Sequence, residues 1–347
     1  MTDFRGPSRR NFLTQCLTGA VAFGAGSALR APAQPSATAA VKSRVDSRVV
    51  VARDPLLRGP DTAVDPQRLE ALLDRAIAAL FGGSHAATVT PEDRVTAWRR
   101  IAGPGDTVSL KVNTLGGRGI STNVDLVAAV CERLQQAGVQ PANIVVWDRD
   151  TEELERAGFR IAIGGRRVQC YGTDRVDYED DLSEWGSVGS CLSKILTRAS
   201  SVLINLPVLK DHDGAGVTIA LKNMYGTIHN PNKYHPNGCD PYIADLNMLP
   251  EIRSRMKLIL CDATAAMYEG GPGFKPEHSW KANSLLVSQD PVALDYTGWQ
   301  IIERKRAEMG LKTLEAEQRA PRYIATAADS EHRLGHCDPS RIVVVEV

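Results

Sequence analysis

The sequence lacks the features that mark several large classes of protein. Only 5% of its 347 residues are aromatic, and Lys plus Arg equal Asp plus Glu at 41 each. A chain without a basic excess has no electrostatic footprint for the phosphates of nucleic acid, so we expect no nucleic-acid partner. The 43% hydrophobic content and the 29 glycines instead indicate a globular α/β protein with tight turns, not an all-β sandwich.

Several cofactor and catalytic motifs are also missing. The seven cysteines stand singly and form no C-x-x-C pair. Iron–sulfur clusters and structural zinc sites usually need cysteines at that spacing. We therefore expect no iron–sulfur cluster. The chain contains no Gly-x-Gly-x-x-Gly turn, no phosphate loop ending in Gly-Lys-Ser/Thr and no Gly-x-Ser-x-Gly elbow, so a dinucleotide fold and a serine hydrolase are poorly supported.

The N-terminus carries features of an export signal. Arg9 and Arg10 are followed by a Gly- and Ala-rich apolar stretch over 16–29 and by a small-x-small site at 31–33. This order resembles a twin-arginine signal, although an ordinary basic helix start shares the paired arginines. The apolar stretch is too short and too rich in glycine for a permanent membrane span. We expect a signal over 1–33, delivery by the twin-arginine translocation machinery, and a soluble periplasmic or extracellular protein without a permanent membrane anchor.

The remaining chain alternates between strand and helix patterns. Residues 34–64 are expected to be a flexible linker and entry segment, because the stretch up to about residue 47 is rich in Ala, Ser and Pro. Residues 65–347 are expected to form one α/β domain. Apolar stripes predict helices at 66–80 and 123–136. Strands are predicted at 106–112, 143–147, 167–171, 201–206, 257–261, 284–287 and 341–347. This pattern predicts a doubly wound, mainly parallel sheet with helices on both faces.

Charged side chains stand where five of the predicted strands end. They are Lys111, Asp148, Lys210, Asp262 and Asp290. An aspartate after a strand often caps the next helix, and each one alone favours that interpretation. Lysine cannot cap a helix N-terminus in this way. Since ligands of open α/β sheets bind outside the carboxyl ends of the strands, the combination predicts one crevice for a charged ligand, or for a metal with an anionic ligand.

Two further segments extend the candidate site. A helix is predicted over 217–225 and ends at Gly226, with Lys222 pointing away from its apolar face, where lysines are usually solvated. The loop 269–273, Glu-Gly-Gly-Pro-Gly, has glycines that let backbone N–H groups approach a ligand. It is a weak phosphate signal by itself.

A group of potential metal ligands lies between these two segments. His229, His235, Cys239 and Asp240 carry imidazole, thiolate and carboxylate donors. Their spacing fits no standard zinc pattern, and the intervening Asn-Pro-Asn and His-Pro-Asn-Gly sequences are ordinary loop formers. We favour a loop over a complete metal site, with His235 and His212 as the histidines more suited to function.

Taken in order, these motifs resemble those of the bacterial and archaeal domain of unknown function 362 family. The motifs are Lys111-Val112-Asn113, Leu209-Lys210-x-His212, Leu221-Lys222-Asn223-x-x-Gly226, His235, Asp262, Glu269-Gly270-Gly271-Pro272-Gly273 and Asp290-Pro291-Val292-Ala293-x-Asp295. The resemblance extends over about residues 105–300. Many members carry a ferredoxin-like region with clustered cysteines, from which this chain departs. The resemblance therefore implies a map of the site and leaves the reaction class open.

We assign expected roles on this basis. The catalytic candidates are His212 for proton transfer, Lys210 and Asp262. The expected ligand-binding residues are Lys111, Asn113, Asp148, Lys222, Asn223, Gly270, Gly271 and Gly273. A divalent metal, if used, would be held by Glu269, Asp290, Asp295 and His235. The expected function is binding of an anionic small molecule or cofactor, with acid/base catalysis as one outcome. The alternative is a non-catalytic binding or cofactor-delivery protein that uses the same site.

Overall fold

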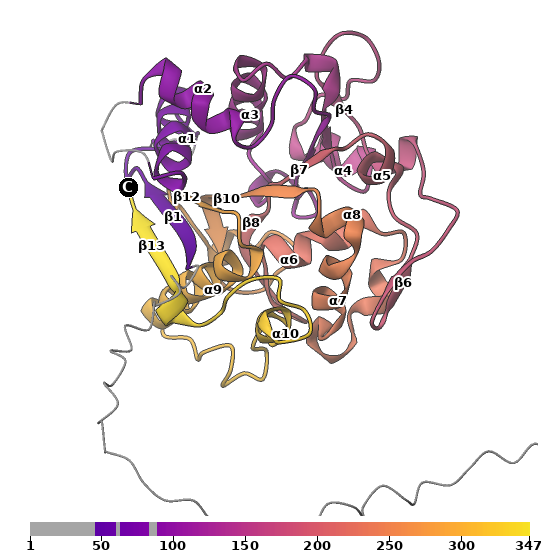
Figure 1. Ribbon diagram of the computed structural model, residues 1–347. Helices are drawn as coiled ribbons and strands as arrows, with labels where there is room; N and C mark the ends of the chain where they lie inside the picture. Colours follow the sequence, from indigo (N-terminus) through magenta and orange to yellow (C-terminus); the bar gives the residue numbers. More distant parts are fainter. Residues whose placement is uncertain (1–45, 60–62, 83–88) are drawn as a thin grey trace, which may run out of the picture. The chain divides into compact units, whose positions relative to one another are not determined.

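An eleven-stranded mixed sheet organises the protein (Figure 1). The structure is a computed structural model that describes residues 46–59, 63–82 and 89–347, so the expected signal lies outside the described residues. The strands along the main path of the sheet, in spatial order, are β13 (Ile342–Glu346), β1 (Ser47–Arg53), β12 (Ser284–Ser288), β10 (Met256–Met267), β7 (Val202–Asn205), β2 (Val108–Lys111), β3 (Ile144–Trp147) and β4 (Gln169–Cys170). Three shorter strands join it beside β10: β8 (Val208–His212), β9 (Gly216–Thr218) and β11 (Ser279–Trp280).

The direction of the strands confirms the prediction of a mainly parallel sheet. The run β10-β7-β2-β3-β4 is parallel throughout, and β13 is parallel to β1. Strand β12 is antiparallel to both of its neighbours, β1 and β10. The carboxyl end of β12 therefore lies at the opposite edge of the sheet from the carboxyl ends of β2, β3 and β7.

Helices cover both faces of this sheet (Figure 1), as predicted. One face packs against α1 (Pro66–Leu80), α2 (Pro91–Arg99) and α3 (Val124–Gln136). The other packs against α6 (Ala220–Asn223), α7 (Tyr242–Met248), α9 (Pro291–Glu308) and α10 (Tyr323–Ala328). Strand β1 shows the reason, since Val49 and Val51 enter one core and Val50 and Ala52 the other, following the two-residue alternation of a strand. The shorter elements are α4 (Thr151–Ala157), α5 (Lys194–Arg198), α8 (Pro250–Arg253) and the hairpin β5 (Ser183–Trp185) to β6 (Val188–Ser190).

Local capping explains why two helices begin where the sequence predicts. The Asp65 side chain accepts hydrogen bonds from the N–H groups of Gln67 and Arg68, and a proline occupies the first turn of α1. Asn123 accepts from two N–H groups at the start of α3 in the same way. Each cap satisfies donors that have no partner within the helix. The predicted ranges 66–80 and 123–136 are confirmed, the second with Asn123 as cap.

The expected linker and entry segment over 34–64 contains a strand that the sequence did not predict. Residues 47–53 form β1, which pairs with β12 on one side and β13 on the other. The Val49–Ala52 run is fully buried between the two helical layers, and an apolar run with cover on both faces is typical of a central strand. The Ala-, Ser- and Pro-rich composition ends before this run begins.

The helix predicted over 217–225 begins later than predicted, at Ala220. Residues 216–218 form β9, which pairs antiparallel with β8, and a single helical turn, α6, follows and continues as a 3-10 turn over Met224–Thr227. Gly216 makes this hairpin feasible, since its φ is +79° and a Cβ there would lie 2.3 Å from the Arg319 carbonyl oxygen. Val217 and Ile219 are both buried, so the apolar pattern here reflects burial on all sides and not a helical stripe.

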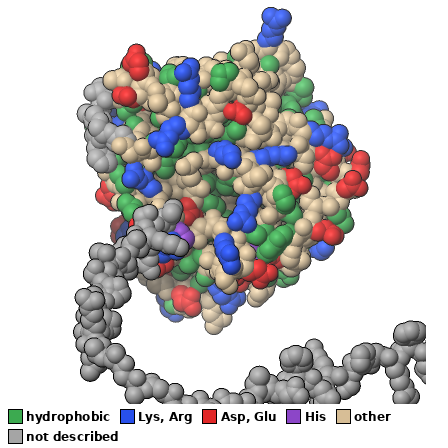
Figure 2. Space-filling view, viewed as in Figure 1, with side chains coloured by type: hydrophobic (Ala, Val, Ile, Leu, Met, Phe, Trp, Pro, Cys, Tyr) green, Lys and Arg blue, Asp and Glu red, His purple; other side chains and the backbone are tan. Residues whose placement is uncertain are grey.

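The protein surface mixes charges of both signs. On the face drawn in Figure 2, Lys and Arg side chains are interspersed with Asp and Glu, in keeping with their equal numbers in the sequence. Within the described ranges, none of the helices combines the length and the apolar character that crossing a membrane requires. A mixed surface limits long-range steering of a charged ligand, so the charges inside cavities matter more for binding.

Candidate functional site

A cavity of about 610 Å³ lies at the carboxyl ends of β2, β3 and β8. Its volume is in the range of small-molecule sites, and its place agrees with the rule for ligands of open α/β sheets. The polar residues that line it include Asn113, Asp148, Lys210, His212, Thr218, Lys222, Asn223, Tyr225 and His235. We call this space the strand-end cavity.

The β8–β9 hairpin places two functional side chains in the strand-end cavity. Lys210 and His212 are two residues apart on β8, so both point to one face of the strand, and Asp211 points to the other. Lys210 pairs across the hairpin with Thr218, which also lines the cavity. The alternation of a single strand thus separates the lysine and histidine from the aspartate between them.

Two buried lysines define the electrostatics of the cavity. Lys210 is 0% exposed and its Nζ donates to the Pro272 carbonyl oxygen at 3.1 Å. Lys222 is 5% exposed, with its Nζ 3.2 Å from His235 Nε2 and 4.1 Å from the centre of the Tyr225 ring. In the part of the chain that the structure describes, neither Nζ has a carboxylate at ion-pair distance. Burial lowers the pKa of each lysine to about 8, because the charged form has lost its water.

Hydrogen-bond partners assign the tautomers of both histidines. The Gly214 N–H donates to His212 Nδ1 at 3.0 Å, so the ring hydrogen of neutral His212 is on Nε2. His235 Nδ1 lies 3.1 Å from the Pro231 carbonyl oxygen, which can only accept, so Nδ1 carries the hydrogen and Nε2 accepts from Lys222. Burial, with the nearby lysines, lowers the pKa of His212 to about 3 and also lowers that of His235. Both rings are therefore neutral near pH 7.

A hydrogen-bonded network supports the floor of the cavity. Lys111 Nζ lies 2.6 Å from Asp148 Oδ1 and donates to the Val112 carbonyl oxygen at 2.7 Å. Asn223 Oδ1 accepts from Asn113 Nδ2 at 3.0 Å. Lys111 is itself buried and does not line the cavity. Its side chain holds Asp148 in place, and this differs from the direct ligand contact that the sequence suggested.

Two buried polar atoms of residues that line the cavity have no hydrogen-bond partner among the described residues. They are Asn113 Oδ1 and Thr218 Oγ1, and their residues are only 7% and 5% exposed. A buried polar atom without a partner costs about 1–3 kcal/mol. Both atoms are themselves almost inaccessible, so a polar group in the cavity could reach them only after a movement of these side chains.

Another part of the cavity wall, around the start of α4, carries several carboxylates together with Arg149. Asp150 and Glu153, from the start of α4, line the cavity together with Asp174. Burial and the neighbouring carboxylates Asp148 and Asp150 raise the pKa of Glu153. The cavity thus has two lysines on β8 and α6, and carboxylates outnumber the one arginine near α4. A ligand with a negative group at one end and hydrogen-bond donors at the other would match both sides.

The structure does not bring Asp262 or Asp290 to this cavity. Strand β10 continues past Asp262 to Met267, and the Asp262 carboxylate accepts from the N–H groups of Asn123 and Thr264 in a separate cavity of about 220 Å³. Asp290 accepts from two N–H groups at the start of α9. Its strand, β12, is antiparallel, so Asp290 lies at the other edge of the sheet. The two aspartates serve as a loop anchor and a helix cap.

Asp295 and Asn223 position the turn that carries Lys222. Asp295 is buried in α9 and accepts from the N–H groups of Ala220 and Leu221 at 2.7 and 3.1 Å. Burial raises the pKa of Asp295 to about 8. Asn223 donates to Asn205 Oδ1 at 2.8 Å. The short α6 turn is thus anchored by side chains from other elements, and Asp295 is not placed as a metal ligand.

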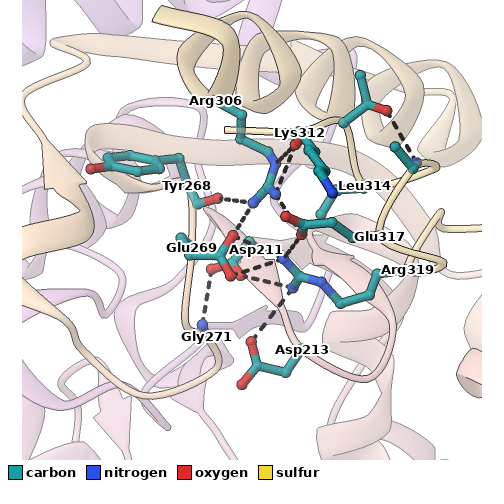
Figure 3. A network of polar contacts seen from close by, with 12 residues as sticks. Asp211, Asp213, Tyr268, Glu269, Gly271, Arg306, Lys312, Leu314, Glu317 and Arg319 are labelled. Atoms are coloured by element: carbon teal, nitrogen blue, oxygen red, sulfur yellow. Dashed lines mark hydrogen bonds and ion pairs between the residues drawn. The ribbon is translucent and has the colours of Figure 1, made fainter. Parts of the chain in front are cut away.

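Glu269 belongs to a network of arginines and carboxylates beside the cavity (Figure 3). Arg306 and Arg319 both contact Glu269 and Glu317. Oxygens of Asp211, Asp213 and Glu269 lie close enough together to hold a metal ion. Arg319 already fills this position, with guanidinium nitrogens 3.6 Å from Asp211, 3.5 Å from Asp213 and 2.8 Å from Glu269. A metal could enter only if Arg319 moved away.

The expected metal ligands therefore do not meet in one place. Glu269 is paired with arginines, Asp290 caps α9, Asp295 holds α6, and His235 contacts Lys222.

The glycine loop contacts the strand-end cavity through the carbonyl group of Pro272 and not through the N–H groups of its glycines. Gly271 N–H donates to Asp211 Oδ1 at 3.0 Å, and a Cβ on Gly271 would lie 2.2 Å from the Asp211 carbonyl oxygen. The loop therefore packs directly on β8 and presents the Pro272 oxygen to Lys210. Gly270 approaches Lys275, and nothing lies within 4 Å of a Cβ built on Gly273. Of the loop residues, Pro272 lines the cavity.

Sequence reasoning missed several lining residues. Thr218 and Tyr225 were expected on one continuous helix. In the structure Thr218 lies on β9 and Tyr225 in the 3-10 turn after α6, and both side chains line the cavity. Glu153 follows the strand-end Asp148 by five residues and is carried in by α4. The position of Asp148 directly after β3 was the feature of the sequence from which this part of the cavity wall could have been predicted.

Comparisons with known proteins give the cavity a context. A family model described as Domain of unknown function (DUF362) matches residues 108–300, a range that contains all residues lining the strand-end cavity. The thylakoid-associated protein sll1697 of Synechocystis sp. is 27% identical over 249 residues, which is 70% of this chain and 75% of that protein. The lactate racemase apoprotein from Thermoanaerobacterium thermosaccharolyticum aligns with a TM-score of 0.39 and 12% identity, over 73% of this chain and 57% of the racemase chain. This chain thus spans a little over half of the racemase.

Proposed function

The chain belongs to the domain of unknown function 362 family, and we propose that it binds a small molecule with a carboxylate or phosphate group in the strand-end cavity. One observation carries this proposal: Lys210 and Lys222 are buried in the same cavity and, within the described residues, neither has a carboxylate at ion-pair distance. An anion would supply the countercharge that two desolvated ammonium groups lack.

Other groups support the orientation of such a ligand. His212 offers its Nε2–H as a donor, because its Nδ1 is already used by Gly214. With its anionic group beside the lysines, such a ligand would extend toward α4.

The same site could serve catalysis or binding alone. Neutral His212 can donate a hydrogen bond to a ligand oxygen, and Glu153, whose pKa is raised by burial, can exchange a proton with the ligand. A non-catalytic binding or cofactor-delivery protein would use the same lysines without turnover. Arg319 already pairs with the carboxylates of Asp211, Asp213 and Glu269, where a metal ion could otherwise be held. The proposal therefore requires no divalent metal. We infer that the lysines, and not an acidic cluster, hold the ligand.

Binding of an anion is expected to weaken as the pH rises above 8. An anion raises the pKa of Lys210 and Lys222 from their free value of about 8. Below that pH both groups are already protonated, whereas above it binding must take up a proton, at a cost of up to about tenfold in affinity per pH unit for each obligatory proton. Isothermal titration with pyruvate and with inorganic phosphate, in two buffers of different ionisation enthalpy, measures the affinity and the proton uptake.

Variants connect this pH dependence to the lysines. The charged or titratable groups that act on them are Asp148, Glu153, Asp211, His212, His235 and Cys239. Lys210→Met should weaken binding of the anion by about tenfold or more, since a charge-assisted hydrogen bond contributes roughly 1.5–3 kcal/mol. Lys233→Met, which changes an exposed lysine of a neighbouring loop, should leave the affinity unchanged. If neither probe binds, or if both variants bind like the wild type, the proposal is wrong.

We also propose export through the twin-arginine pathway, on the basis of the N-terminal sequence. Changing Arg9 and Arg10 together to Lys should leave the full-length precursor in the cytosol, because the pathway recognises the arginine pair and not the charge alone. Cell fractionation followed by immunoblotting measures the outcome. Arg5→Lys, which lies outside the pair, is the matched control and should be exported normally. Normal delivery of the double variant to the periplasm would contradict the proposal.

A further inference from the structure

We propose that Lys222 is a covalent nucleophile that forms an imine with the carbonyl carbon of a 2-oxo acid, with His235 as its base. This deepens the proposed function and rests on it, because Lys210 would hold the carboxylate of the same molecule. The cavity geometry, the fixed histidine tautomers and the unequal surroundings of the two lysines support the assignment.

Lys222, His235 and Pro231 form a chain of the kind that activates a nucleophile. Lys222 Nζ is 3.2 Å from His235 Nε2, and His235 Nδ1 is 3.1 Å from the Pro231 carbonyl oxygen. The carbonyl accepts the Nδ1 hydrogen and leaves the Nε2 lone pair directed at the amine. A nucleophile beside a base that a third group orients is the general pattern of covalent catalysis. His235 is therefore placed to receive a proton from Lys222.

The surroundings of Lys222 favour a free amine. It is buried, it shares the cavity with Lys210, and no carboxylate of the described residues pairs with it, whereas the neighbouring Cys239 acts in the other direction and favours its charged form. Burial lowers its pKa to about 8, which leaves a fraction unprotonated near neutral pH. A desolvated lysine beside a second cation is a recognised arrangement for attack on a carbonyl.

Lys210 has a different environment and suits a different task. Its Nζ donates to the Pro272 carbonyl oxygen, and within the described residues no ring nitrogen lies at hydrogen-bond distance from it, so it has no imidazole base to remove its proton. As an ammonium group it would bind a carboxylate. A 2-oxo acid carries its carboxylate on the carbon that Lys222 would attack, so one small molecule can engage both lysines. His212 Nε2–H is available to donate to the carbonyl oxygen.

The proposed step is balanced without an external oxidant or reductant. The Nζ lone pair of Lys222 attacks the carbonyl carbon and the C=O π bond opens onto oxygen, where the His212 Nε2–H stabilises the negative charge. His235 Nε2 takes the two amine hydrogens in turn and passes them to that oxygen. The C–O bond then breaks, water leaves, and a C=N bond to Lys222 remains. One amine and one ketone give one imine and one water.

Reductive trapping tests this inference. The purified protein is incubated with pyruvate and sodium borohydride, and the product is analysed by intact mass and peptide mapping. We expect one adduct per chain, attached to Lys222 through a reduced C–N bond. Lys222→Met should abolish the adduct, and Lys233→Met should leave it unchanged. His235→Gln should slow trapping by about 10²-fold, the scale of general-base catalysis, and should shift its pH profile upward, which a purely structural role would not do.

The outcomes separate this inference from the proposed function. Adducts spread over exposed lysines, or an equal adduct in Lys222→Met, would overturn the inference. If pyruvate binds with proton uptake but forms no adduct at Lys222, the imine is ruled out and anion binding stands. If neither pyruvate nor phosphate binds and no adduct forms, both are wrong. Peptide mapping of the wild-type protein decides the site of attachment even if the Lys222→Met chain fails to fold.

Discussion

Lys111→Met is expected to lower the free energy of unfolding by about 3–5 kcal/mol, the cost of leaving one partner of a buried ion pair uncompensated. Lys111 and Asp148 are both buried, with 2.6 Å between Nζ and Oδ1. Gly226 packs directly against this ion pair, since a Cβ at that position would lie 2.7 Å from Lys111 Nζ. Asp148 would then keep only its hydrogen bonds from neighbouring residues and the limited contact with water on its cavity side. Urea unfolding followed by circular dichroism measures the loss.

Two further variants identify the cause of that loss. Lys257→Met removes an exposed lysine from β10 and should change stability by less than about 0.5 kcal/mol. Adding Asp148→Asn to Lys111→Met should restore part of the lost stability, because the uncompensated charge disappears while an oxygen remains for the Thr114 N–H, which donates to Asp148 at 2.9 Å. A Lys111→Met protein as stable as Lys257→Met would show that the pair is not important for the fold.

Arg306→Met is expected to destabilise the protein by a similar amount, about 3–5 kcal/mol, and to loosen the wall of the strand-end cavity. Arg306 is 0% exposed and donates to the carbonyl oxygens of Tyr268 at 3.0 Å and Lys312 at 2.9–3.0 Å. It also pairs with Glu269 and Glu317 (Figure 3). Without the guanidinium, these acceptors lose a shared donor.

The effect should be local as well as global. Hydrogen–deuterium exchange should rise in residues 268–273 and 309–319, because Arg306 joins these two segments. The first segment presents the Pro272 oxygen to Lys210, so the affinity for an anion should also fall. Arg304→Met is the matched control, since Arg304 is exposed on the same helix. Unchanged exchange in both segments would contradict the proposed role of Arg306.

Much of the fold follows from signals that lie within a few residues. The start of α1 is set by Asp65 and the proline after it, and the sheet strands are set by apolar runs such as Ile144–Trp147. Caps and apolar periodicity act over a single turn or strand, so they can be recognised without the tertiary structure. The mainly parallel sheet and its two helical layers were predictable for the same reason. Lys210 and His212 could also be identified, since they end a buried run.

Only the tertiary structure decided which charged residues share a site. Asp262 and Asp290 follow apolar strands as Asp148 does, but β10 continues beyond the first and β12 runs in the opposite direction before the second. Strand length and direction depend on which neighbours pair and on contacts between residues far apart in the chain. The contact between Lys222 and His235 arises in the same way, from the α6 turn that Asp295 holds from another helix. Long-range packing sets these positions, and no local pattern in the sequence encodes them.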